Sequence, residues 1–144
     1  MYKTILVPID LGEKAVAGQT VDVAADMARR YGAEMHVLTV VPSYGFAIVG
    51  AGFPKDYEKQ LLTNAQHSLK TFLDACPLED ITVHGHVAHG TIYDEIMKAA
   101  DALKCDLIVM ASHRPELKDY LLGPNAARVV RHARQSVFVV RDAG

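Results

Sequence analysis

The 144-residue chain is poor in cysteine, with only Cys76 and Cys105, far apart and without a CxxC spacing. Two such residues make neither a disulfide framework nor a zinc site, and they are typical of reduced side chains in a cytoplasmic protein. Long apolar runs are also missing, and the short one at the N-terminus is ended by Pro8 and Asp10, unlike a signal peptide. We therefore expect a soluble cytoplasmic protein with no membrane partner.

The chain also lacks an excess of charge. Fifteen basic residues stand against seventeen acidic ones, which leaves a formal net charge of −2. A domain that grips a nucleic-acid backbone by releasing counterions carries a surplus of positive charge, so we expect no nucleic-acid partner. The chain is half hydrophobic and too short for two ordinary domains, so residues 1–144 are expected to form one domain around one core.

What the chain does contain is a regular alternation of strand and helix patterns. Continuous apolar runs indicate buried strands, and apolar residues three and four apart indicate helices. The expected strands are residues 3–9, 34–41, 81–88, 106–110 and 136–141, of which 81–88 is indicated by an alternation of apolar and polar residues. The expected helices are residues 15–31, 54–76 and 91–103, and a last one that starts at Gly123-Pro124 and reaches Arg134.

Local signals mark some element boundaries. Gly32 stands where a left-handed C-cap belongs after the first helix. Thr91 and Asp94 predict a box-like N-cap for the third helix. The segment 42–52 is too apolar for a linker and too rich in glycine for a regular element, so we expect a mobile flap there.

Alternating strands and helices predict an α/β fold, a single doubly wound domain with a five-stranded parallel sheet and four helices. With the first strand central, the strand order is 3-2-1-4-5, and the ligand crevice lies between the first and fourth strands at their carboxyl ends. The residues expected to meet there are Pro8, Ile9, Asp10, Val40, Val41, Met110, Ala111 and Ser112, together with the start of the last helix.

The start of the last helix predicts a phosphate site. Gly123 and Pro124 are a helix-start signal, because proline pre-sets φ and has no N–H to leave unpaired. The backbone N–H groups from Asn125 onward then point outward at the positive end of the helix dipole, close to the end of a parallel strand. Phosphate oxygens are the ligands that such donors favour.

Several motifs in order resemble the universal stress protein family over essentially the whole chain. They are Ile5-Leu6-Val7-Pro8-Ile9-Asp10, Gly90, Ile108-Val109-Met110-Ala111-Ser112-His113, Leu121-Leu122-Gly123 and Val137-Phe138-Val139-Val140-Arg141. Ala-Ser-His-Arg-Pro followed by Tyr120-Leu121-Leu122-Gly123 is most similar to the F/G-type members. The resemblance implies an ATP-binding stress-response or signalling module, and Mg²⁺ accompanying ATP would lie near Asp10.

In ATP-binding members the family pattern is G-x-x-G, nine residues, then G-[ST], which cradles ribose and phosphates. Asp10, Val40, Met110, His113 and Gly123 match the family. Ala111 and Arg114 stand in place of the two glycines, Pro124 replaces the Ser or Thr, and the loop is one residue shorter. The implied ATP-binding residues are Pro8, Ile9, Asp10, Val40, Met110, Ala111, His113, Arg114, Gly123, Pro124, Asn125 and Ala126.

Plainer interpretations stand beside these. Asp10 could simply cap the first helix, and His113 with Arg114 could be an exposed loop pair. Pro124 removes one hydroxyl and one N–H from the phosphate cradle, whereas Arg114 offers a bidentate cation in return. The alternative to ATP binding is a nucleotide-free protein-interaction module that acts through its homodimer surface on a client protein the sequence does not name.

Catalytic motifs are missing. The chain has no Walker A sequence, no G-x-S-x-G elbow and no Ser-Gly-Gly loop after the first strand. We expect no dedicated catalysis and at most slow ATP hydrolysis.

Three histidines, His84, His86 and His89, share one expected strand. Their spacing could place two imidazoles on one face for a metal ion, but no carboxylate or cysteine stands close by to complete the set. They are interpreted as the polar face of an edge strand, and no metal site is expected.

The last strand, residues 136–141, is expected to be a sheet edge. Its run Val137-Phe138-Val139-Val140 carries no proline or inward charge to protect that edge from pairing. An isologous partner would cover it at least cost, so we expect a homodimer through this strand, as the family resemblance also implies.

Overall fold

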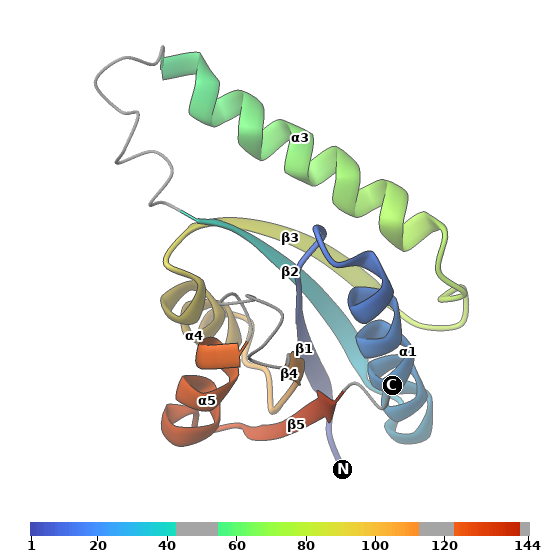
Figure 1. Ribbon diagram of the computed structural model, residues 1–144. Coiled ribbons are helices and arrows are strands. Elements are labelled where there is room, and N and C mark those ends of the chain that lie inside the picture. Colours follow the sequence, from blue (N-terminus) through green and yellow to red (C-terminus); the bar gives the residue numbers. More distant parts are fainter. Residues whose placement is uncertain (43–54, 113–122, 142–144) are drawn as a thin grey trace.

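The computed structural model describes residues 1–42, 55–112 and 123–141 (Figure 1). The elements in chain order are β1 (Thr4–Ile9), α1 (Lys14–Tyr31), β2 (Glu34–Pro42), α3 (Lys55–Asp74), β3 (Val83–Gly90), α4 (Ile92–Ala102), β4 (Leu107–Ser112), α5 (Gly123–His132) and β5 (Ser136–Arg141). Every predicted strand and helix is present, with ends that shift by one or two residues in most cases. The predicted flap at 42–52 lies outside the described residues, apart from Pro42, which is the last residue of β2.

The strands form one parallel sheet in the order β3-β2-β1-β4-β5. The predicted doubly wound topology is therefore confirmed. β1 is the central strand, and its residues Ile5–Ile9 are all buried, as a strand covered on both faces requires. β3 and β5 are the two edges, and the burial of β5 alternates with exposure along its length.

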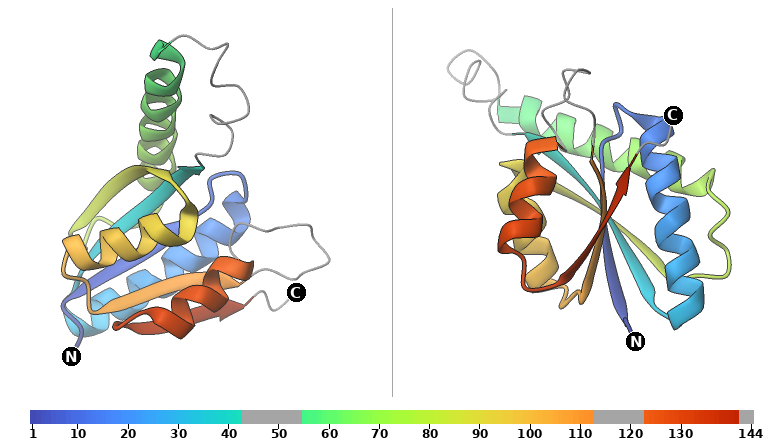
Figure 2. Two further views of the ribbon diagram at one scale, coloured as in Figure 1. Left: turned by 90° about the vertical axis from the view of Figure 1, so that its left-hand side faces the viewer. Right: turned by 60° about the horizontal axis from the view of Figure 1, so that its bottom comes forward.

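Helices cover both faces of the sheet. Both views in Figure 2 show α4 and α5 together on the face opposite α1. Successive strand residues point to opposite faces, so Val7 and Met35 pack in a core with α1 and α3, while Leu6 and Leu38 pack in a second core with α4 and α5. Two separate cores, one on each face, hold the sheet in place.

The first helix ends as predicted. Gly32 adopts φ 66° and ψ 33°, the left-handed conformation, and its N–H bonds the carbonyl of Ala28. Glycine reaches that conformation without the steric cost that a Cβ would add.

The predicted N-cap of the third helix is only half right. Thr91 occupies the N-cap position of α4, but among the described contacts its side chain makes no capping hydrogen bond. The helix start is held instead by the Thr91 backbone carbonyl, which accepts the N–H of Glu95 at 2.9 Å. Asp94 and Glu95 still place negative charge in the first turn, where the helix dipole favours it.

The amino end of the sheet is tied by one side chain. The Asp106 carboxylate accepts the backbone N–H groups of Lys3 at 3.0 Å and Thr4 at 3.1 Å. The backbone N–H of Asp106 in turn donates to the Thr4 carbonyl at 3.0 Å. These bonds hold the starts of β1 and β4 side by side.

None of the helices in the described part of the chain combines the length and apolar character that a membrane crossing needs.

Candidate functional site

The sheet opens at the carboxyl ends of β1 and β4. β1 pairs with β2 at six positions, from Thr4 with Glu34 to Ile9 with Thr39. Its pairing with β4 covers only Ile5 with Leu107 and Leu6 with Ile108. The two strands therefore part beyond Leu6, at the topological switch where a ligand crevice is expected.

A small cavity of about 80 Å³ lies beside this opening, at the carboxyl ends of β1 and β2. Its walls include four residues that the sequence placed at the site: Pro8, Ile9, Asp10 and Val40. Ile92 and Ile96 from the start of α4 close it from the side, together with Leu38 and Pro42 of β2. Ligand pockets usually measure roughly 300–1,000 Å³, so this recess has room for only part of a nucleotide, and its lining suits an apolar ring.

Asp10 holds a turn at the mouth of the recess. Its Oδ1 accepts the backbone N–H of Gly12 at 2.9 Å, and its carbonyl accepts the N–H of Glu13 at 3.0 Å. This is an Asx-type turn that leads into α1. The plainer interpretation, that Asp10 caps the first helix, is wrong, because the N-cap residue of α1 is Glu13 and Asp10 shapes the turn before it.

At the end of β4 and the start of α5, the groups available to a ligand are mainly backbone groups, because the side chains there are largely buried. Met110 is 0% exposed, Ala111 3% and Ala126 2%, and all three belong to the core under α4 and α5. Their side chains are committed to packing, so a ligand here would meet main-chain groups. α5 begins at Gly123 as predicted, with Pro124 exposed and Asn125 half-buried. The predicted residues His113 and Arg114 lie outside the described residues.

A larger open groove of about 540 Å³ runs between α3 and β3. It is lined by aliphatic side chains such as Leu69 and Leu73 and by charged ones such as Lys70 and Glu79. Leu69 and Val83 belong to the α1 and α3 side of the sheet, and none of the predicted site residues lines the groove. Size alone does not mark the site, because this groove brings together no group with distinctive chemistry.

A polar cluster that the sequence interpretation missed lies at the amino end of β2 and β3. Glu34 and His36 come from β2, and His84 and His86 come from β3. The statement that no carboxylate stands near the histidines was wrong, because parallel pairing places β2 beside β3 and brings Glu34 within reach. The available signal was a Glu-x-His on one expected strand and a His-x-His on its expected neighbour.

Burial and neighbouring histidines act on the imidazole of His86. Burial lowers the pKa of His86, and the positive charge that His36 and His84 would carry lowers it further. Both effects favour the neutral form of His86.

Sequence comparison places the chain in a known family. Residues 1–141 match the model of the universal stress protein family. The chain belongs to the universal stress protein family. It is 32% identical over 143 residues to Universal stress protein G of Escherichia coli O157:H7, an alignment that covers 98% of this chain and 100% of the relative. It is 27% identical over 155 residues to Universal stress protein MJ0577 of Methanocaldococcus jannaschii, covering 98% and 96%.

Solved structures agree with this family membership. The structure of MJ0577 superposes with a TM-score of 0.81 at 26% identity and covers 100% of this chain and 99% of its own. A universal stress protein of Archaeoglobus fulgidus, solved in complex with dAMP, gives a TM-score of 0.69 at 20% identity, with coverage of 96% of this chain and 97% of its own. A further universal stress protein structure, solved in complex with cAMP, gives a TM-score of 0.60 at 23% identity, with coverage of 97% of each chain. At these lower identities the likeness shows the fold alone.

Proposed function

We propose that this universal stress protein binds ATP in the crevice between β1 and β4, as a cytoplasmic stress-response or signalling module. The observation that carries the proposal is the apolar recess lined by Pro8, Ile9 and Val40 at the carboxyl ends of β1 and β2, beside the place where β1 and β4 part. The recess suits the adenine ring. Asp10 at its mouth is positioned to meet the nucleoside, or a water of Mg²⁺ bound with ATP.

The triphosphate is assigned to the start of α5. Backbone N–H groups of Gly123, Asn125 and Ala126 stand in its first turn, where the helix dipole favours anions. Pro124 contributes neither an N–H nor a hydroxyl, so the cradle has two donors fewer than a serine or threonine would give it. His113 and Arg114 complete the assignment as partners of ribose or phosphate. The proposal includes at most slow hydrolysis.

The fold neighbours solved with dAMP and cAMP make an adenine nucleotide the first ligand to try. Their identities to this chain are 20% and 23%, so the residue assignments rest on the recess and the helix start and are not transferred from them.

Calorimetry with ATP and Mg²⁺ tests the proposal, with the Val40→Phe variant as the probe of the recess. A phenyl ring should fill a cavity of about 80 Å³ and weaken ATP by at least about tenfold, or 1.4 kcal/mol. Val130→Phe is the matched control, because Val130 is 53% exposed on α5. Native protein at a nucleotide concentration of a hundred times Kd should gain about 2.7 kcal/mol of stability.

Absence of both heat and thermal shift at millimolar ATP would contradict the proposal. The alternative function would then stand: a nucleotide-free interaction module that works through its dimer surface on a client protein. One observation favours that alternative, the 44% exposure of Phe138 on the edge strand β5.

Both functions include a homodimer through β5. The strand is a sheet edge, and Val137–Val140 offers unpaired backbone groups beside the exposed Phe138 ring. A two-fold partner would pair β5 with its own copy in antiparallel fashion, which satisfies those groups on both chains at once.

Val139→Lys tests the dimer by placing like charges near the two-fold axis. The variant should sediment as a monomer with an unchanged circular dichroism spectrum, whereas Val130→Lys on α5 should remain dimeric. Native protein that sediments as a monomer at about 50 µM would rule the dimer out, because an association energy of roughly 8 kcal/mol would be visible there.

A further inference from the structure

Glu34, His36, His84 and His86, here called the histidine cluster, lie on one face of the β2–β3 pair. His36 is paired in register with His84, and Leu38 with His86. Because side chains alternate along a strand, Glu34 and His36 share the face of Leu38, which packs in the core with α4 and α5. The cluster lies near the amino ends of the strands, and the ATP crevice lies at their carboxyl ends.

His36 is the fixed centre of the cluster. Its side chain is only 9% exposed, and its ring stacks on those of His84 and His86 with centroids 4.9 Å and 5.0 Å away. His36 Nε2 lies 3.2 Å from Glu34 Oε1, and His36 Nδ1 lies 2.8 Å from His86 Nε2. Contacts on both ring nitrogens fix the orientation of this imidazole.

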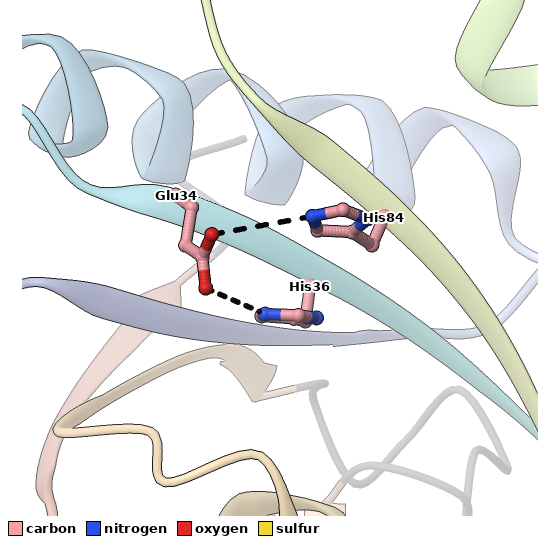
Figure 3. Close-up of side chains that lie close together, drawn as sticks. All are labelled: Glu34, His36 and His84. Atoms are coloured by element: carbon pink, nitrogen blue, oxygen red, sulfur yellow. Dashed lines mark hydrogen bonds and ion pairs between the residues drawn. The ribbon is translucent and has the colours of Figure 1, made fainter.

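The other two side chains are accessible and converge on the same point. The side chains of His84 and Glu34 are 49% and 42% exposed. His84 Nε2 lies 4.0 Å from Glu34 Oε2, so the carboxylate faces both imidazoles from one side, with one oxygen directed at each (Figure 3). One ligand atom from each of Glu34, His36 and His84 can be chosen so that all three lie within 4.8 Å of one another.

These donors match one class of ion. Two imidazole nitrogens and one carboxylate oxygen suit Zn²⁺, which binds such ligands at about 2.0–2.2 Å in a tetrahedron and often keeps one open position for water. Mg²⁺ and Ca²⁺ prefer all-oxygen sets and are disfavoured by two imidazoles. Tetrahedral ligands at these bond lengths stand about 3.3 Å apart, close to the 3.2 Å between His36 and Glu34. The exposed side chains of His84 and Glu34 must rotate to bring their donor atoms, now 4.0 Å apart, to this spacing.

We propose that Glu34, His36 and His84 form a Zn²⁺ site and that His86 is its positioning residue. When His36 Nε2 binds the ion, its proton resides on Nδ1, which donates to His86 Nε2 across the observed 2.8 Å. Such a partner on the second ring nitrogen holds a histidine in its ligating tautomer. The ion joins β2 to the edge strand β3, and water occupies the fourth position. The site is independent of ATP binding.

The simpler explanation is a hydrogen-bond chain in which Glu34 and His86 only satisfy the buried imidazole of His36. That explanation predicts no affinity for Zn²⁺ and no special role for His84, which stacks on the ring of His36. The two explanations therefore predict different effects for a substitution of His84.

Titration of the chelator-treated, nucleotide-free protein with Zn²⁺ alone tests the proposal by calorimetry. One ion should bind per chain with a Kd of about 10 µM or tighter. His84→Gln should weaken binding at least about tenfold, and His86→Gln should weaken it by about ten- to a hundredfold although all three ligands remain. Both variants keep a polar side chain, and circular dichroism should show an unchanged fold.

His67→Gln is the matched control, because His67 is an exposed histidine on α3 with no place in the cluster. It should bind Zn²⁺ as the native protein does. Co²⁺ gives a second readout: native protein should show the absorption of a tetrahedral complex with nitrogen and oxygen ligands, and His84→Gln should lose it. A native Kd weaker than about 1 mM, or equal affinities for His84→Gln and His67→Gln, would overturn the proposal.

Discussion

The α4 face of the sheet has two ends of different character, and β2 contributes to both. At its carboxyl end, Leu38 and Val40 line an apolar recess beside the opening between β1 and β4. At its amino end, Glu34 and His36 join two histidines of β3 in the histidine cluster. One strand thus contributes to the wall of an apolar cavity and to a polar side-chain cluster, six residues or fewer apart.

The difference lies in how each region is assembled. The recess forms where strands end and chain segments turn away, a place that topology alone locates in a doubly wound sheet. The histidine cluster forms within paired strands, where the register decides which side chains face one another. A shift of one residue between β2 and β3 would leave the recess in place but would separate His36 from His84.

The largest expected effect concerns Cys105, which precedes β4 at the amino end. Burial, and then the charges of Asp106 and Glu34, raise the pKa of its thiol to about 12. At about pH 8, iodoacetamide should therefore alkylate Cys105 roughly a thousandfold more slowly in the folded protein than in urea, because the thiolate is the nucleophile. Peptide mass spectrometry measures this, with the half-buried Cys76 as the internal comparison.

The same shift predicts a pH effect on stability. Folding keeps the Cys105 thiol protonated, whereas the thiol of the unfolded chain ionises near the ordinary cysteine pKa of 9.0. The free energy of unfolding should therefore fall as the pH rises above about 9, and Cys105→Ala should lessen that fall. In the alkylation experiment, equal rates for Cys105 and Cys76 in the native protein would contradict the expected protection of Cys105 and would show that the amino end of β4 is open to solvent.

The next effect concerns Leu38, which lies between the two regions. Its side chain is 1% exposed, lines the recess and sits opposite His86 in the register. Leu38→Ala should lower the free energy of unfolding by about 2–5 kcal/mol, measured by urea denaturation, because it leaves a cavity in the core. Val130→Ala, at a site 53% exposed, should change it by less than about 0.5 kcal/mol. A similar loss in both variants would mean that the recess wall is not part of the core.

The smallest expected effect concerns Pro124, which lies at the start of α5, on the carboxyl-end side of the sheet where the recess lies. Pro124→Ser restores an N–H and adds a hydroxyl at the start of α5, and it should tighten ATP by about 0.5–1.5 kcal/mol, the net worth of one hydrogen bond. The same variant should leave Zn²⁺ affinity unchanged. Calorimetry with each ligand checks both parts. An unchanged ATP affinity would show that the phosphates do not bind at the start of α5.

Local signals in the sequence determined the elements and their order. Apolar runs identified four strands, and an alternation of apolar and polar residues identified β3. The continuous hydrophobicity of β1 predicted that it is central, from which the order of the sheet followed. The same reasoning located Pro8, Ile9, Asp10 and Val40 at one crevice, because the carboxyl ends of neighbouring parallel strands meet at one edge. These features depend on periodicity and chain direction, which a single sequence carries.

Tertiary structure decided what each polar side chain contacts. Asp10 turns to Gly12, and Thr91 stands at an N-cap without capping, because local geometry selects among partners that the sequence leaves equivalent. Glu34 and His84 are fifty residues apart, and only the register of β2 with β3 brings them together. Side-chain chemistry is encoded locally, but its assembly into a site depends on hydrogen-bonded strand pairing, which is a property of the folded sheet.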